Sequence, residues 1–239
     1  MRINKYIASC GGYSRRSAEQ LILDKRVCVN GKLVTNLATD IDENNDTVTV
    51  DKKPLNKINK KYYLMLHKPK GYVTTLHDEK GRKTVMDFFP PAIKNIVKPI
   101  GRLDMDSEGL LLFTNDGELT KKLTHPSSGI KKHYQVKIEG KIEKSEVEAL
   151  KQGTTINIAG QEVETNPAQV TVKEESPDGK FTKLDVVISE GKNREIRKMF
   201  ESVGKTVVFL KRTQIGKLTL GGLPRGKFKE FDPKYTLSN

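Results

Sequence analysis

The sequence predicts an α+β protein in which a small N-terminal domain precedes a larger domain of strands and helices. Three observations support this prediction. The first fifty of the 239 residues combine two short helical patterns with one hairpin pattern, a Lys/Asn-rich stretch follows, and strand-like runs then recur between a few helix-like stretches. Because strands and helices do not alternate regularly, a doubly wound parallel sheet is not expected.

The N-terminal domain, residues 1–52, contains the two predicted helices and the hairpin. The stretch INKYIASC places apolar residues at the i, i+3, i+4, i+7 spacing of a short helix, and two glycines end it. Ser14 is the expected N-cap of the second helix. The stretch VCVNGKLV then alternates around Asn30-Gly31, a dipeptide typical of two-residue hairpin turns.

Residues 53–61 form the predicted linker. They belong to DKKPLNKINKK (Asp51–Lys61), which has one Pro and little apolar content. The larger domain, residues 62–239, contains strand-like and helix-like stretches in an irregular order. The strand-like runs are YYLMLHK, LLLFT, YQVKIEG, QVTVKE, KLDVVIS and TVVFLKR, and the helix-like stretches are DGELTKKLTH and GKNREIRKMFESVG.

The chain carries a strong excess of positive charge. Its 43 Lys and Arg against 30 Asp and Glu give a formal net charge of +13 and a pI ≈ 9.5. Between Met1 and Val34, seven Lys or Arg stand against two acids, and between Gly191 and Lys234 twelve stand against four. Two explanations fit: a polyanionic partner such as nucleic acid, or a lysine-rich surface that favours solubility.

Cysteine usage and hydropathy exclude several classes of protein. Cys10 and Cys28 form no CxxC motif and have no paired His cluster, so neither a metal site nor a disulfide framework is expected. No apolar run approaches the roughly 18 residues that a membrane span needs. The N-terminal sequence lacks the apolar core of a signal peptide. The sequence therefore predicts a reduced, cytoplasmic protein.

An acidic stretch precedes one apolar strand pattern. In GRLDMDSEGLLLFTNDG (Gly101–Gly117), three carboxylates, Asp104, Asp106 and Glu108, stand before the run LLLF. The spacing imitates the start of an EF-hand loop, but the twelfth position is Asn115 instead of a bidentate Glu, so we expect no calcium. Two neighbouring carboxylates could also serve a hydrolase of nucleosides or sugars, which is retained as a hypothesis.

Five segments in order resemble the bacterial ribosomal-RNA pseudouridine synthases of the RsuA/RluB/RluE/RluF group. The acidic stretch is similar to the family signature, and LHKPKGYVTT is similar to its first motif. HPSSGIKKHYQVKIEG is similar to the segment with the active-site tyrosine, and EGKNREIRKMFESVGKTVVFLKRTQIGKLTL to the arginine-bearing third motif. INKYIASCGGYSRRSAEQLI and VCVNGKLV resemble the alpha-L RNA-binding motif of a small-subunit ribosomal protein.

The resemblance implies both a fold and a reaction. The fold is an S4-like RNA-binding domain at 1–52 and a catalytic domain at 62–239, built on a mixed, mainly antiparallel sheet flanked by helices. The reaction converts uridine in RNA to pseudouridine, its C-glycoside isomer. The base detaches from ribose, turns, and is rejoined through carbon, with no cofactor and no metal. The target base must first be flipped out of its stack.

The resemblance assigns catalytic roles to Asp104, Tyr134 and Arg197. Asp104 matches the catalytic aspartate, which starts the reaction either by attacking the substrate or by removing a proton from the ribose. Burial favours a neutral carboxylic acid, so a fixed cation is needed to keep Asp104 ionised, and Arg197 is the expected partner. Tyr134 matches the tyrosine that stacks on the flipped base.

Alternation along the extended segment before LLLF predicts the direction of four side chains. It places Arg102 and Asp104 on one face, toward RNA, and Leu103 and Met105 in the core. Arg102 is expected to fill the gap that the flipped base leaves. The other residues expected to contact RNA are all basic: Arg2, Lys5, Arg15, Arg16, Lys25, Arg26, Lys32, Lys68, Lys192, Arg194 and Lys198.

We therefore expect a monomeric enzyme whose partner is ribosomal RNA or a ribosomal precursor particle, with large-subunit RNA favoured over small-subunit RNA. The alternative is a non-catalytic ribosome-assembly factor that keeps the fold and uses only its basic surfaces. The presence of Asp104, Tyr134 and Arg197 together favours the enzyme, because binding alone needs none of them in this arrangement.

Overall fold

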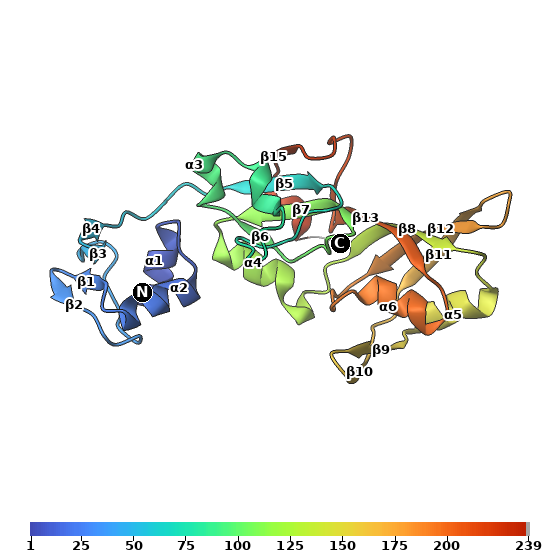
Figure 1. Cartoon of the computed structure of the whole chain (residues 1–239), viewed down its shortest axis with the longest axis horizontal. Helices are drawn as coiled ribbons and strands as arrows, with labels where there is room; N and C mark the ends of the chain where they lie inside the picture. The colour runs from blue at the N-terminus through green and yellow to red at the C-terminus, as the bar shows by residue number, and fades with distance from the viewer. Residues whose placement is uncertain (238–239) are drawn as a thin grey trace. The chain divides into compact units, whose positions relative to one another are not determined.

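The computed structural model describes residues 1–237, which divide into two compact units (Figure 1). The first unit is Met1–Tyr62 with Phe89–Lys98, and the second is Tyr63–Phe88 with the chain from Pro99 onward. These limits differ from the predicted domain limits in two places. Strand β4 (Lys53–Pro54) pairs with the first unit's sheet, inside the predicted linker. Residues 89–98 also join the first unit, where the Gly12 N–H donates to the Asn95 carbonyl at 2.7 Å.

The first unit combines three helices with a small antiparallel sheet of order β2-β1-β3-β4. Its elements are α1 (Ile3–Ser9), α2 (Arg15–Leu23), β1 (Val27–Val29), β2 (Lys32–Leu33), β3 (Val48–Val50), β4 (Lys53–Pro54) and α3 (Pro91–Lys94). Ser14 caps α2 by accepting from the Ser17 N–H at 3.0 Å, as predicted. Asn30 and Gly31 have φ values of 50° and 77°, the left-handed backbone that a two-residue hairpin turn requires.

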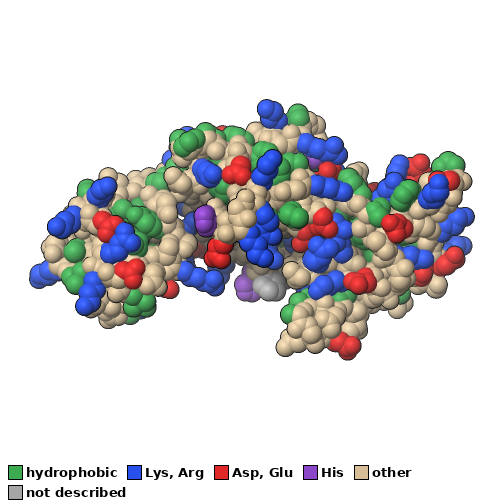
Figure 2. Space-filling model, viewed as in Figure 1, with side chains coloured by type: hydrophobic (Ala, Val, Ile, Leu, Met, Phe, Trp, Pro, Cys, Tyr) green, Lys and Arg blue, Asp and Glu red, His purple; other side chains and the backbone are tan. Residues whose placement is uncertain are grey.

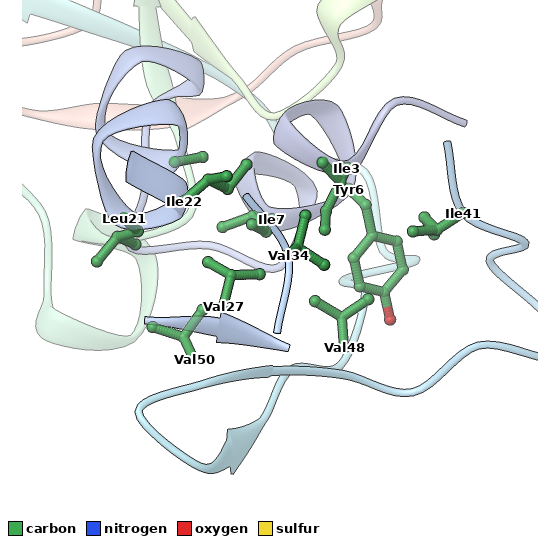
Figure 3. Packing of buried hydrophobic residues seen from close by; sticks show 11 residues of the cluster. Ile3, Tyr6, Ile7, Leu21, Ile22, Val27, Val34, Ile41, Val48 and Val50 are labelled. Atoms are coloured by element: carbon green, nitrogen blue, oxygen red, sulfur yellow. The ribbon is translucent and has the colours of Figure 1, made fainter. Parts of the chain in front are cut away.

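A single apolar cluster holds the first unit together. In Figure 3 the side chains of α1 and α2 point toward those of β1 and β3. Its members are Ile3, Tyr6, Ile7, Ala18, Leu21, Ile22, Val27, Val34, Ile41, Val48 and Val50. Each large aliphatic side chain so buried contributes about 1.5–3 kcal/mol. The apolar positions that predicted the first helix, Ile3, Tyr6 and Ile7, therefore lie in this core.

The second unit is built on one large mixed sheet. Its path is β11-β12-β8-β13-β7-β5-β15, with β6 attached to β7 and β14 to β13. Strands β7 and β13 are parallel. The other neighbours on this path are antiparallel: β11–β12, β12–β8, β8–β13, β5–β7 and β15–β5. The remaining strands are β5 (Tyr63–Lys68), β6 (Lys98–Ile100), β7 (Glu108–Thr114), β8 (Lys132–Glu139), β9 (Thr155–Ile158), β10 (Gln161–Glu164), β11 (Gln169–Glu175), β12 (Phe181–Ile188), β13 (Val207–Ile215), β14 (Leu218–Thr219) and β15 (Phe228–Glu230). The predicted α+β class with a mainly antiparallel sheet is confirmed.

Helices flank this sheet (Figure 1). They are α4 (Gly117–Thr124), α5 (Lys144–Gln152) and α6 (Glu195–Ser202), with 3₁₀ turns η1 (Val85–Phe88), η2 (Pro126–Ser128) and η3 (Pro233–Thr236). α4 packs on β7, α5 on β11, and α6 on β13 and β9. Within residues 1–237 we find no helix with the length and apolar character of a membrane span.

Candidate active site

The acidic stretch forms a tight turn directly before a fully buried strand. All seven residues of β7 are buried, as its apolar run predicts. The Ser107 N–H donates to the Asp104 carbonyl at 3.1 Å and closes a four-residue turn. This turn breaks the alternation expected there. Leu103 is buried as predicted, but Met105 is 47% exposed, so its predicted place in the core is wrong.

Lys68, at the end of β5, anchors this turn from within the protein. Its side chain is fully buried, and Nζ donates to the carbonyls of Asp104 at 2.9 Å, Ser107 at 2.8 Å and Pro69 at 3.1 Å. Burial lowers the pKa of Lys68 to about 8, although the charges of Asp104 and Asp106 oppose the shift. The prediction that Lys68 contacts RNA is therefore wrong, since its ammonium is enclosed and its donors are used.

Arg194, the residue before α6, is the cation that faces the Asp104 carboxylate. Its Nη1 lies 3.6 Å from Asp104 Oδ2 and 3.4 Å from Asp106 Oδ1. The Asp104 side chain is 27% exposed and that of Arg194 44%, so the pair contributes at most about 1 kcal/mol to stability. A left-handed backbone at Arg194, with φ of 51°, marks the start of α6. The cation expected beside Asp104 is present.

Arg197 holds the same turn but does not pair with Asp104. Its Nη2 lies 3.1 Å from Asp106 Oδ2 and donates to the Asp106 carbonyl at 3.2 Å, and Nη1 donates to the Val207 carbonyl at 2.7 Å. Burial lowers its pKa, while the charges of Asp106 and Asp104 oppose this. The prediction that Arg197 is the direct partner of Asp104 is wrong, because Nη1 is bound to β13 and Nη2 to the neighbouring Asp106.

A cavity of about 440 Å³ in the second unit lies beside Asp104. Its charged and aromatic lining includes Asp104, Tyr134, Lys132, Glu190, Glu195 and Arg212. Tyr134 lies on β8 and is 7% exposed, so one aromatic ring and one carboxylate share the cavity, as predicted. The volume is within the range of about 300–1,000 Å³ that is typical of small-ligand sites.

Two carboxyl groups that the sequence did not single out meet at the cavity wall. Glu195 is 4% exposed, and burial together with the nearby Glu190 raises its pKa to about 8. Glu190 is also partly buried, but hydrogen bonds from the Lys192 side chain and the Asn166 N–H lower its pKa. The pair therefore shares one proton near neutral pH.

We expect Glu195→Gln to flatten the pH dependence of stability. The folded-state pKa of Glu195 is raised from 4.5 to about 8, so the folded protein keeps a proton that the unfolded chain releases. The contribution of protonated Glu195 to the free energy of unfolding is fully present below pH 4.5, and it is lost as the pH rises toward 8. The amide mimics the protonated acid, so the variant should match wild type in acid and exceed it by about 2–4 kcal/mol in mild alkali. Urea unfolding across this pH range measures the free energy of unfolding of both proteins. If it changes with pH equally in wild type and Glu195→Gln, the shared proton is contradicted.

The predicted RNA-contacting cations fall into two groups. In the first unit Arg2, Lys5, Arg15, Arg16, Lys25, Arg26 and Lys32 are all exposed. Figure 2 shows cations of this unit spread over the visible face and interspersed with acids. Arg2 pairs with Asp40 and Arg26 with Asp51.

In the second unit the predicted cations differ in how available they are. Arg102 is exposed and lines the cavity beside Asp104. Lys192 is engaged by Glu190. Lys198 is half-buried, and its Nζ donates to the Asn157 carbonyl at 2.6 Å. Arg102 therefore keeps the greatest freedom to meet a ligand, whereas Arg194 faces Asp104 and Asp106.

Comparison with known families assigns the class of protein that this fold and cavity define. A family model described as RNA pseudouridylate synthase matches residues 62–202, more than half of the chain, and one described as S4 domain matches residues 1–48. The chain belongs to the RNA pseudouridylate synthase family, a family of isomerases, and carries an S4 domain. The predicted family, enzyme class and S4-like domain are confirmed.

Individual relatives cover nearly all of the chain. Ribosomal large subunit pseudouridine synthase B of Bacillus subtilis (strain 168) is 40% identical over 235 residues, covering 97% of this chain and 92% of the relative. The protein of the same name from Pasteurella multocida (strain Pm70) is 36% identical, covering 97% of this chain and 67% of the relative. A crystal structure of a pseudouridylate synthase has a TM-score of 0.69 at 29% identity, covering 99% of this chain and 98% of that one.

Proposed function

We propose that this enzyme isomerises specific uridines of large-subunit ribosomal RNA to pseudouridine, with Asp104 as the catalytic carboxylate. The observation that carries the proposal is the Asp104 carboxylate beside a cavity shared with Tyr134, inside the segment that the family model matches. The choice of RNA rests on the relatives from Bacillus subtilis and Pasteurella multocida, both named for the large subunit.

The proposed reaction needs a carboxylate that stays ionised as a base closes over it. Asp104 either attacks the nucleotide or removes a proton from the ribose, and both routes need its negative charge. Arg194, at 3.6 Å, supplies a positive charge that persists at any physiological pH. Lys68 and Arg197 hold the backbone of the turn and so orient the carboxylate. Arg197 is thus proposed to act by positioning, through Asp106.

The target base has to leave its stack to reach the cavity, which costs a few kcal/mol. Stacking on the Tyr134 ring would return about 1–3 kcal/mol. Phosphate contacts from the exposed cations of the first unit would supply the remainder and hold the RNA near the cavity. We propose that the protein acts as a monomer on ribosomal RNA or on a ribosomal precursor particle, and therefore in the cytoplasm.

Mapping pseudouridine tests the proposal directly. Ribosomal RNA from cells with and without the gene is compared by a reverse-transcription assay, and the purified protein is then added to the RNA that lacks it. We expect at least one large-subunit uridine to lose its modification and to regain it on addition of the protein. Loss only in small-subunit RNA would contradict the choice of RNA, and no change in any RNA would contradict the activity.

Charge removal in the first unit should weaken the salt dependence of RNA binding. Arg15 and Arg16 are both exposed at the start of α2. If each meets one phosphate, Arg15→Gln with Arg16→Gln lowers the slope of log K against log salt by about 1.4 to 1.8. A matched double variant, Lys173→Gln with Lys183→Gln, removes two cations that pair with Asp185 and Glu174 in the second unit. Equal slopes for the two double variants would contradict docking through α2.

A further inference from the structure

Arg212 is a buried cation for which the proposed chemistry gives no role. It lies on β13, is 4% exposed and lines the cavity beside Asp104. Its Nε donates to the Leu110 carbonyl at 2.7 Å, which fixes the plane of the guanidinium group. Its Nη2 is buried and has no hydrogen-bond partner within residues 1–237. A buried donor without an acceptor is unfavourable, and native proteins rarely keep one without a use.

Within residues 1–237 the Arg212 side chain forms no ion pair. The carboxylates that line the cavity are committed elsewhere, as described above: one faces Arg194, one is held by Lys192, and one keeps a proton near neutral pH. The buried side chain of Lys68 and the half-buried side chain of Lys132 lie close enough for the charge of Arg212 to reach them. The inner part of the cavity is therefore electropositive, and it presents a hydrogen-bond donor that lacks an acceptor.

The strands around Arg212 direct it to the same space as Tyr134. The two residues are register partners on β13 and β8, and such partners project to the same face of a sheet. On the other side, Arg212 is the register partner of Gly109 on β7. A Cβ at Gly109 would lie 2.2 Å from the Arg212 carbonyl oxygen, and its φ is 114°, so only glycine permits this close approach.

We propose that Arg212 Nη2 donates a hydrogen bond to O4 of the target uracil and so selects uridine over cytidine. The proposal rests on the proposed function and deepens it. A flipped nucleotide brings its base into the cavity, while its phosphates stay with the strand outside, so a deeply buried donor meets the base. Cytosine carries an amino group in place of O4, and two donors would then oppose each other without an acceptor.

The turning of the base allows the same donor to serve substrate and product. The bond from ribose C1′ to N1 breaks, and the uracil turns about the axis through N3 and C6. This turn exchanges C5 with N1 and O4 with O2. The bond from C1′ to C5 then forms, C5 releases its proton, and N1 gains one. Because O2 arrives where O4 had been, Arg212 can hold the ring before and after the turn.

Kinetics with a sulfur-substituted target provide the first test. Sulfur accepts hydrogen bonds poorly, so wild type should lose about 10-fold or more in kcat/KM when the target uridine is replaced by 4-thiouridine. Arg212→Met should lose roughly 10- to 100-fold on uridine and show little further loss on 4-thiouridine. Arg82→Met, which removes an exposed arginine paired with Asp78, is the matched control and should behave as wild type. The sulfur effect is the ratio of kcat/KM on uridine to kcat/KM on 4-thiouridine. If Arg212→Met shows the same sulfur effect as wild type, the proposal is overturned.

Binding provides a second test that does not depend on turnover. Fluorescence anisotropy compares a short oligouridine with an oligocytidine of the same length. We expect wild type to prefer the uridine strand and Arg212→Met to bind both equally. If wild type modifies no ribosomal uridine but shows this Arg212-dependent preference, the proposed function fails and the role of Arg212 stands. If modification is normal and Arg212→Met changes neither the sulfur effect nor the preference, only the role of Arg212 fails.

A conservative variant guards against a folding artefact. Arg212→Lys keeps the positive charge but loses the planar group that Leu110 orients, so it should bind RNA as wild type and show an intermediate preference for uridine. Thermal melts of all variants verify that they fold. If Arg212→Met does not fold, the same sulfur comparison is made with Arg212→Lys, and an unchanged ratio would overturn the proposal.

Discussion

Replacing Asp104 by Asn should abolish isomerisation while leaving RNA binding within a few-fold of wild type. The amide preserves the shape of the carboxylate but can neither attack the substrate nor accept a ribose proton. We expect kcat/KM to fall by more than about 10³-fold. The side chain is 27% exposed and its ion pair with Arg194 is solvated, so stability should change by less than about 1 kcal/mol. Tritium release from C5-labelled uridine measures turnover, and filter binding measures affinity.

Asp106→Asn is the matched control for this experiment. Asp106 is two residues away in the same turn, is 46% exposed, and pairs with both Arg194 and Arg197. It lies outside the residues that line the cavity, so its charge supports the turn without meeting the base. We expect a loss of no more than about 10-fold. Equal losses at the two positions, or full turnover by Asp104→Asn, would overturn the assignment of the catalytic acid.

The local features of the fold could be predicted because they depend on near neighbours in sequence. Asn30-Gly31 forms a hairpin turn through its own backbone preference, and Ser14 caps α2 by a bond to Ser17. The apolar run in β7 became a fully buried strand. The interactions that determine these features lie within a few residues of one another in sequence. Sequence analysis can therefore predict them.

The contacts of the site depend instead on residues far apart in the chain. Lys68 reaches Asp104 from a separate strand, so its burial could not be seen from its basic character. The one available signal was its position at the end of an apolar run and before Pro69. The raised pKa of Glu195 depends on its burial and on the nearby Glu190, and neither can be seen from the segment's sequence.

Arg194 faces Asp104, although the sequence predicted Arg197 for that place. This difference also depends on contacts that the local sequence pattern does not show. The sequence pattern of GKNREIRKMFESVG does not show at which residue the helix begins. In the structure α6 begins only at Glu195, and Arg194 adopts a left-handed backbone that brings its side chain to Asp104. Helix ends are the least predictable part of a helix, and here one of them determines which cation faces the catalytic acid.

Lys68→Met should impair turnover far more than its effect on stability explains. The variant fills the same space but removes three donors from the carbonyls of Asp104, Ser107 and Pro69. Each unsatisfied carbonyl costs about 1–3 kcal/mol. Removing the charge recovers about 3 kcal/mol, because burial had lowered the pKa of Lys68 from 10.5 to about 8. The net loss of stability should be a few kcal/mol. The loosened turn displaces the Asp104 carboxylate, and we expect kcat/KM to fall by about 10²-fold or more.

The pH dependence of stability distinguishes this account from a general packing defect. The folded-state pKa of Lys68 is lowered, so below pH 8 the folded protein bears the full cost of the buried charge, and this cost disappears as pH rises from about 8 to 10.5. Wild type should therefore gain stability relative to Lys68→Met across that window, measured by urea unfolding. Lys70→Met, at an exposed lysine two residues along, should follow wild type in both turnover and pH profile. If Lys68→Met retains the turnover of Lys70→Met, the buried ammonium does not position the catalytic turn.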